Sequence, residues 1–174
     1  MLDLLPAAVA ALDAASSLGA VAGRLLLGAV VGVAAAVVMA IPMWRQDDGF
    51  TPAYVAAAVV RRTTPDEVSF ADANVAHHAA GGLAGVLYAV VYLATDAVAP
   101  DLGVAGVDLP SHLVATAVVV AFIYVAFARF VLPRAGRRIY EERATAVRGQ
   151  WLRSSLVFGA TLLVLAPVVF TGVA

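Results

Sequence analysis

Four long apolar stretches constrain the fold more than any other feature of this sequence. Residues 25–44, 79–95, 113–128 and 154–174 contain no charged side chain. An α-helix rises about 1.5 Å per residue, so about 20 apolar residues span the roughly 30 Å hydrocarbon core of a bilayer. Only 13% of the residues are charged, which leaves too little polar surface to cover a water-soluble globule. The sequence therefore predicts an all-α, polytopic membrane protein, a four-transmembrane-helix bundle.

We expect a single membrane domain over residues 1–174. Its spanning helices are predicted at residues 22–44, 74–96, 111–132 and 151–172. A separate short helix over residues 1–20 is expected to lie on the membrane surface, because Asp3 and Asp13 interrupt its apolar residues. Residues 97–110 are predicted to form a loop between the second and third spanning helices.

Short interfacial helices are predicted in the two longer connections, residues 45–70 and 134–150. In the first connection, Thr51-Pro52 and Thr64-Pro65 each place a capping hydroxyl before a proline, which is typical of a helix start. In the second connection, apolar side chains recur at helical spacing, namely Tyr140, Ala144, Val147 and Trp151. We therefore expect a helix that lies along the membrane surface and leads into the last spanning helix.

Arginine is distributed unequally between the two predicted sides of the membrane. The chain has 11 basic residues, all of them arginine, and only Arg24 lies on the same side as the N-terminus. The others lie in or beside the two longer connections, and basic connections usually face the cytoplasm. The sequence therefore predicts a multi-pass protein of the cell membrane with both termini outside. The same arginines could also recruit anionic lipid or a partner protein.

Small residues recur every four positions on the first two predicted spanning helices. The first helix carries Gly28, Gly32, Ala36 and Ala40, and the second carries Gly81, Gly85 and Ala89. Inside a bilayer, helices associate through close packing and hydrogen bonds, because lipid is as apolar as the side chains. We therefore predict that both stripes are helix-packing faces.

The second predicted helix also carries the most polar side chains of the apolar stretches. One side of it presents Asn74, His77, Gly81, Gly85, Tyr88 and Tyr92. Polar groups at membrane depth usually face the interior of a bundle. This side is therefore predicted to be a helix-contact face or, in an oligomer, the wall of a polar pathway.

The same helix carries the spacing His77-x3-Gly81-x3-Gly85-x2-Tyr88. It follows a first helix with the sequence GAVVGVAAAVVMAIPM at residues 28–43. Together these features resemble small, uncharacterised four-helix membrane protein families of bacteria and archaea. The resemblance covers the first two helices clearly and the last two in length and spacing. It implies the four-helix fold and no particular activity.

His77 and His78 lie near the arginine-rich side of the second helix, shortly after Asp72 and Asn74. Imidazole titrates near neutral pH, so the pair could relay protons or bind an ion. The alternative is an interfacial pair satisfied by water, lipid headgroups or neighbouring polar side chains. We favour the alternative, because nothing in the sequence places these side chains in the middle of the membrane.

His112 lies on the opposite side, together with Asp96, Asp101 and Asp108. These four side chains could form a weak cation site, but solvation in the loop is the favoured interpretation. His112 is predicted to lie a membrane thickness from His77, so the histidines cannot share one metal ion. The chain also has no cysteine. We therefore predict no metal and no cofactor.

The sequence contains no catalytic or nucleotide-binding motif, and its net charge of −1 indicates no nucleic-acid partner. We therefore favour a non-enzymatic structural or interaction component of the bilayer that packs against itself or another membrane protein. One alternative is a small homo-oligomeric channel or transporter for an ion or small solute, lined by Asn74, His77, Tyr88 and Tyr92. The least favoured is a membrane enzyme acting on lipid, with His78 and Asp72 as its base pair.

Overall fold

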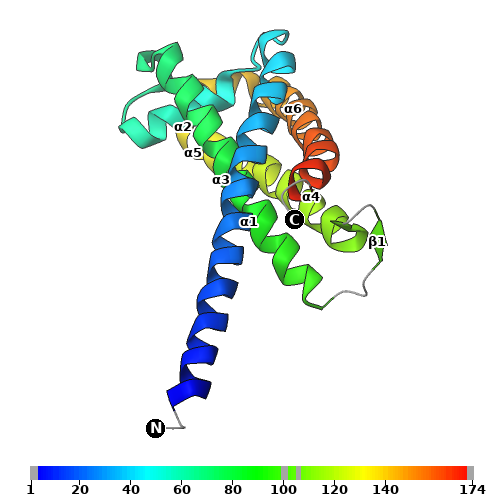
Figure 1. Cartoon of the computed structure of the whole chain (residues 1–174). Coiled ribbons are helices and arrows are strands. Elements are labelled where there is room, and N and C mark those ends of the chain that lie inside the picture. The colour runs from blue at the N-terminus through cyan, green and yellow to red at the C-terminus, as the bar shows by residue number, and fades with distance from the viewer. Residues whose placement is uncertain (1–3, 99–101, 105–106, 172–174) are drawn as a thin grey trace.

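Helices make up nearly all of the computed structural model, which describes residues 4–98, 102–104 and 107–171 (Figure 1). The long helices are α1 (Leu4–Trp44), α3 (Phe70–Asp96), α4 (Leu109–Val125) and α6 (Arg138–Thr171). The shorter ones are α2 (Thr51–Arg61), the 3₁₀ helix η1 (Pro65–Glu67), the π-helix η2 (Ala126–Val131) and α5 (Leu132–Ala135). Two short antiparallel strands, β1 (Gly103–Val104) and β2 (Val107–Asp108), form a hairpin with Gly103 opposite Asp108.

Four helical stretches are long and apolar enough to cross a membrane. They are Ser16–Trp44, Phe70–Asp96, Leu109–Ala135 and Arg138–Phe170. This finding confirms the predicted helical class and the number of long apolar helices. α2 begins at Thr51 and η1 at Pro65, so both threonine–proline pairs mark helix starts. Thr64 is the N-cap of η1 as expected, but the N-cap of α2 is Phe50 and not Thr51.

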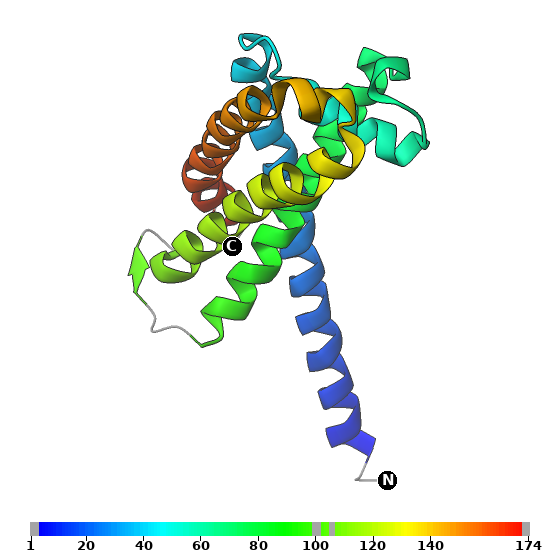
Figure 2. The same cartoon turned by 180° about the vertical axis from the view of Figure 1, so that it is seen from behind.

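The four long helices pack as a bundle with two distinct ends. α1 packs mainly against α3 and α6, and α4 packs against the same two helices. Figures 1 and 2 show α2, α5 and the beginning of α6 gathered at one end, with the β1–β2 hairpin at the other. We call the first the arginine-rich end, since α2, α5, the first turns of α6 and the connections beside them hold most of the arginines, and the second the hairpin end.

The N-terminal helix differs from the prediction. A separate helix over residues 1–20 was expected, but α1 runs unbroken for 41 residues from Leu4 to Trp44. At about 1.5 Å per residue it is about 60 Å long, roughly twice the hydrocarbon core of a bilayer. The chain between Asp13 and Leu25 contains no proline, so nothing there ends the helix. Its first half extends well beyond the rest of the bundle (Figure 1).

α1 and α3 meet through their small residues. A Cβ added at Gly32 would lie 2.7 Å from Gly85 Cα, and one added at Gly81 would lie 2.5 Å from Ala36 Cβ. Such distances are shorter than side chains tolerate, so the two backbones touch directly. Gly28 lies against Gly85 in the same way, and Ala36 and Ala40 are buried. The two small-residue stripes therefore form one helix contact.

The two helices expected over residues 134–150 and 151–172 meet earlier in the chain than the sequence predicted, within α6. α6 runs from Arg138 to Thr171 as two helical segments that meet at a kink at Arg143, where φ is −136° and ψ is 15°. The side that carries Tyr140, Ala144, Val147 and Trp151 packs against buried side chains of α2, η2 and α5. The apolar spacing in this segment therefore reflects contact with protein, which is why the helix does not stand apart from the bundle.

A buried aspartate ties the α1–α2 turn to α6. The Asp48 carboxylate is buried and accepts a 2.5 Å hydrogen bond from Arg143 Nη1, at the kink. The Asp48 backbone N–H donates to Gln150 Oε1 at 2.9 Å. Together these contacts hold residues 45–50 over the beginning of α6.

Asp48→Asn is expected to lower the free energy of unfolding by about 1–2 kcal/mol, because a charge-assisted hydrogen bond to a buried carboxylate is lost. The measurement is unfolding by denaturing detergent in mixed micelles, followed by tryptophan fluorescence. Asp47→Asn is the matched control, since Asp47 is exposed. Equal shifts in the two variants would contradict a role for the Asp48–Arg143 pair.

Candidate functional site

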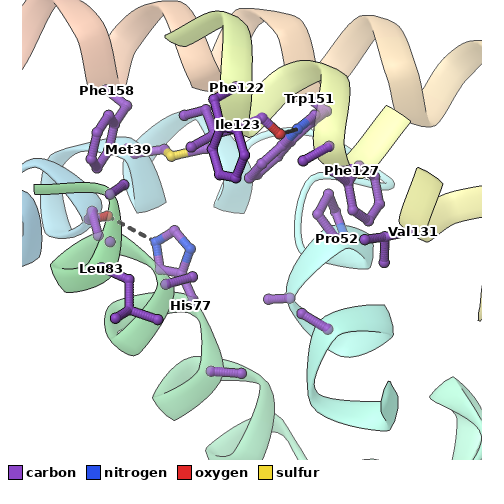
Figure 3. A pocket seen from close by; sticks show the side chains of 18 of the residues that line it. Met39, Pro52, His77, Leu83, Phe122, Ile123, Phe127, Val131, Trp151 and Phe158 are labelled. Atoms are coloured by element: carbon purple, nitrogen blue, oxygen red, sulfur yellow. Dashed lines mark hydrogen bonds between the residues drawn. The ribbon is translucent and has the colours of Figure 1, made fainter. Parts of the chain in front are cut away.

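A cavity of about 420 Å³ lies inside the arginine-rich half of the bundle (Figure 3). α1 and α2 contribute Met39 and Pro52 to its wall, α3 contributes His77 and Leu83, and α6 contributes Trp151. Apart from His77 and the indole N–H of Trp151, its side chains are apolar. This volume falls within the range of pockets that hold small molecules.

The cavity arises from an imbalance in side-chain size. On one side its wall consists mainly of alanine and glycine from α1, α2 and α3. On the other side large side chains from α4, η2 and α6 face them, namely Phe122, Phe127, Trp151 and Phe158. Alanine side chains are too short to reach across the gap, so the space stays open.

The cavity opens sideways between α3 and α4. Leu83 and Phe122 line it, yet they are 71% and 57% exposed on the outside of the bundle. Both side chains belong to the helices long enough to cross a membrane. A molecule can therefore reach the cavity through the apolar flank of the bundle.

A π-helix forms part of the cavity wall. Ala126, Phe127 and Val131 of η2 line it. α6 donates hydrogen bonds to backbone carbonyls in and just before this segment, from Arg148 Nε to Ala128 O at 3.1 Å and from Trp151 Nε1 to Ile123 O at 3.1 Å. Short π-helical segments occur often at functional sites, because the wider turn redirects side chains.

The two tryptophans have different environments. Tryptophan side chains are common at membrane interfaces, so the sequence predicts that both anchor the bundle there. Trp44 is 65% exposed, whereas Trp151 is half-buried, and its ring packs against Phe127 with centroids 5.2 Å apart. Trp151 is therefore part of the pocket.

His77 is buried, with 6% of its surface exposed, and points toward α1. Its Nε2 atom lies 2.9 Å from the backbone oxygen of Ala36. A carbonyl oxygen only accepts hydrogen bonds, so Nε2 carries the proton and donates. Figure 3 shows the other ring nitrogen facing the open space of the cavity. The sequence favoured water, lipid headgroups or neighbouring polar side chains as partners of His77, whereas in the structure its partner is a backbone carbonyl.

His78 and Asp72 do not form the base pair considered for an enzyme. His78 Nδ1 lies 2.8 Å from the backbone oxygen of Asn74, one turn earlier in α3. The Asp72 carboxylate accepts hydrogen bonds from Arg61 at 2.5 Å and from Ser69 Oγ at 2.7 Å. Each side chain is thus occupied by another partner, and these contacts fasten the start of α3.

At the hairpin end, His112 lies inside the bundle. It is 3% exposed, and its Nδ1 is 2.7 Å from Tyr88 Oη and its Nε2 is 3.2 Å from Leu163 O. The expected solvated histidine is therefore wrong, because α3, α4 and α6 enclose the ring. His112 instead links these three helices.

Among the described residues, the weak outer cation site that the sequence left open as the less favoured alternative is not formed. Asp108 caps α4, because its carboxylate accepts a hydrogen bond from the backbone N–H of Ser111 at 3.0 Å. The same carboxylate also accepts one from the backbone N–H of Leu102 at 3.1 Å. Hydrogen bonds from Ser111 and Leu102 lower the pKa of Asp108. Asp101 lies outside the described residues. Within the described part of the chain, no three histidine or carboxylate side chains are placed to hold a metal ion.

The six residues predicted on one side of α3 are divided between two contacts. His77, Gly81 and Gly85 face α1, whereas Tyr88 packs against His112 and Phe170. Asn74 and Tyr92 are half-buried, and Tyr92 Oη accepts the backbone N–H of Asp108 at 3.1 Å. His77, Gly81, Gly85, Tyr88 and Tyr92 therefore make contacts within the bundle, and His77 and Gly81 also line the cavity.

The sequence had indicated His77 but not the cavity around it. Alanines and aromatic residues from six separate elements form the wall, and none of them belongs to a local motif. No protein-family model, curated protein or solved structure matches this chain. The chemistry of the pocket residues is thus what indicates a ligand.

Proposed function

We propose that this chain is a non-enzymatic, multi-pass protein of the cell membrane that binds a lipophilic molecule from the bilayer. In this proposal the four long helices span the membrane. The arginine-rich end faces the cytoplasm and both termini lie outside, because basic connections are retained on the cytoplasmic side. The bilayer is then both the solvent of the protein and the source of its ligand.

The sideways opening of the cavity is the observation that carries this proposal. A pocket between Leu83 and Phe122 is reached from the flank that lipid would cover. Lipid chains and the pocket wall are similarly apolar, so binding depends on close contact with the wall rather than on transfer out of water. A molecule that follows the shape of the cavity gains these contacts.

The other two functions have less support. A channel through an oligomer would need His77 and Tyr88 on its wall, but both side chains are buried in contacts within one chain. An enzyme using His78 and Asp72 would need them bonded to each other. A homo-oligomer or a membrane-protein partner stays compatible with the binding proposal, because the first half of α1 extends beyond the bundle.

Trp151 provides a direct test of ligand binding. The protein has two tryptophans, and Trp44→Phe leaves Trp151 in the pocket wall as the only one. The variant is placed in lipid nanodiscs, and long-chain alcohols and alkyl methyl ethers brominated in the chain are titrated in as quenchers. We expect saturable quenching by one or both kinds of probe, because a pocket holds one bound chain beside Trp151.

Two blocking variants and one control complete the test. Ala84→Phe and Ala56→Phe fill the pocket from α3 and α2, and each is expected to weaken quenching at least about tenfold by removing contact area. Val75→Phe is the control, since Val75 is 69% exposed on α3 and does not line the pocket. Quenching that rises linearly with probe concentration and is the same in both blocking variants as in their parent protein would refute binding in this cavity.

A further inference from the structure

His77 presents one unused hydrogen-bond acceptor to an otherwise apolar pocket. Because Nε2 donates to Ala36 O, a neutral ring has a lone pair on Nδ1. Within the ranges that the structure describes, no protein group donates a hydrogen bond to this nitrogen, and it faces the cavity (Figure 3). A ligand in the pocket would therefore leave this acceptor unsatisfied unless it supplied an O–H or N–H group.

The pocket also selects against charge. No arginine, aspartate or glutamate lines it. A phosphate or ammonium group inside would have no counterion, and burying an unpaired charge in apolar surroundings is very costly. A positive charge on the His77 ring would also be buried without a counterion, so the ring is neutral. The head of a ligand that enters the pocket is thus uncharged.

The position of His77 along α3 fits a molecule with a polar head and a long chain. His77 lies seven residues after Phe70, which is about 10 Å along the helix from the arginine-rich end. The pocket continues from there to Leu87, about 15 Å deeper. A head at His77 would lie near the membrane surface, while its chain would run toward the bundle centre or leave between Leu83 and Phe122.

We infer that the ligand is an uncharged lipid alcohol or a similar amphiphile, whose hydroxyl or N–H donates to Nδ1 of His77. This inference rests on the proposed function, since it names the class of molecule that the pocket binds. The hydroxyl positions the ligand, and the apolar wall holds its chain.

The test compares a chain-brominated long-chain alcohol with its methyl ether in the Trp44→Phe protein in nanodiscs. The two probes have the same chain, but only the alcohol can donate a hydrogen bond. We expect the alcohol to bind about tenfold more tightly, the size of effect that one buried hydrogen bond provides. His77→Leu should abolish this difference, while His78→Leu should keep it, because His78 does not line the pocket.

The outcomes separate the inference from the proposed function. If neither probe quenches saturably, the binding proposal itself fails. If both bind equally well in the protein with His77 intact, the pocket is real but the assigned hydrogen bond is wrong. This comparison needs no substitution at His77, so it decides the question even if His77→Leu fails to fold. His77→Gln, which keeps a donor and an acceptor, should retain part of the preference for the alcohol.

Discussion

Gly85→Ala is expected to disrupt the contact between α1 and α3 and to lower the free energy of unfolding by about 3 kcal/mol or more. The new methyl group would meet backbone on the facing helix, with Gly32 Cα at 2.8 Å. Backbone atoms cannot move aside as a side chain can, so the helices must separate. Unfolding by denaturing detergent in mixed micelles measures the loss.

The neighbouring glycine is the matched control for this change. A methyl group at Gly82 would meet Val33 Cγ2 at 3.3 Å, the end of a side chain that can shift slightly. Gly82→Ala is therefore expected to leave stability nearly unchanged. The higher helix propensity of alanine, worth about 1 kcal/mol, offsets the cost of shifting the Val33 side chain. If Gly85→Ala were tolerated as well as Gly82→Ala, the close backbone contact would be wrong.

His112→Ala is expected to cost about 3 kcal/mol, the second large effect. Leu163 O only accepts, so His112 Nε2 donates to it and Nδ1 accepts from the Tyr88 hydroxyl. Removing the ring leaves the buried Tyr88 hydroxyl and the part-buried Leu163 carbonyl without these partners, and each loss costs about 1–3 kcal/mol. Detergent unfolding is again the measurement.

Tyr88→Phe removes one of the two hydrogen bonds and is expected to cost about 1 kcal/mol. In a variant that combines His112→Ala with Tyr88→Phe, the two losses of unfolding free energy should not add, because both substitutions remove the same Tyr88–His112 bond. Tyr124→Phe on α4 is the control, since Tyr124 is half-buried with no hydrogen bond among the described residues. Strict additivity of the two losses would contradict a direct bond.

The sequence determined the class of fold because its signal is local. A run of about 20 uncharged residues predicts a long apolar helix without knowledge of its neighbours. The threonine–proline pairs likewise mark helix starts through their own backbone chemistry, and α2 and η1 begin there. The glycine stripes on α1 and α3 lie against each other, because only small residues let two backbones approach closely.

The partners of the two buried histidines could not be predicted from the local sequence. The sequence singled out both histidines as polar groups. It assigned His77 to water, headgroups or neighbouring polar side chains, and His112 to solvent in the loop. In the structure His77 donates to a carbonyl 41 positions away and His112 to one 51 positions away. Such partners are backbone atoms, which carry no residue-specific signal, so no sequence pattern could reveal them.

The ends of the helices and the cavity depend on the tertiary structure. α1 continues through the segment expected to be separate, whereas α6 is kinked at Arg143, where Asp48 and the apolar cluster hold its first turns against the bundle. The pocket is space left between alanines on three helices and aromatic rings on the others. The apolar composition of each segment determined that it would be helical, whereas the unfilled volume depends on which side chains face one another after packing.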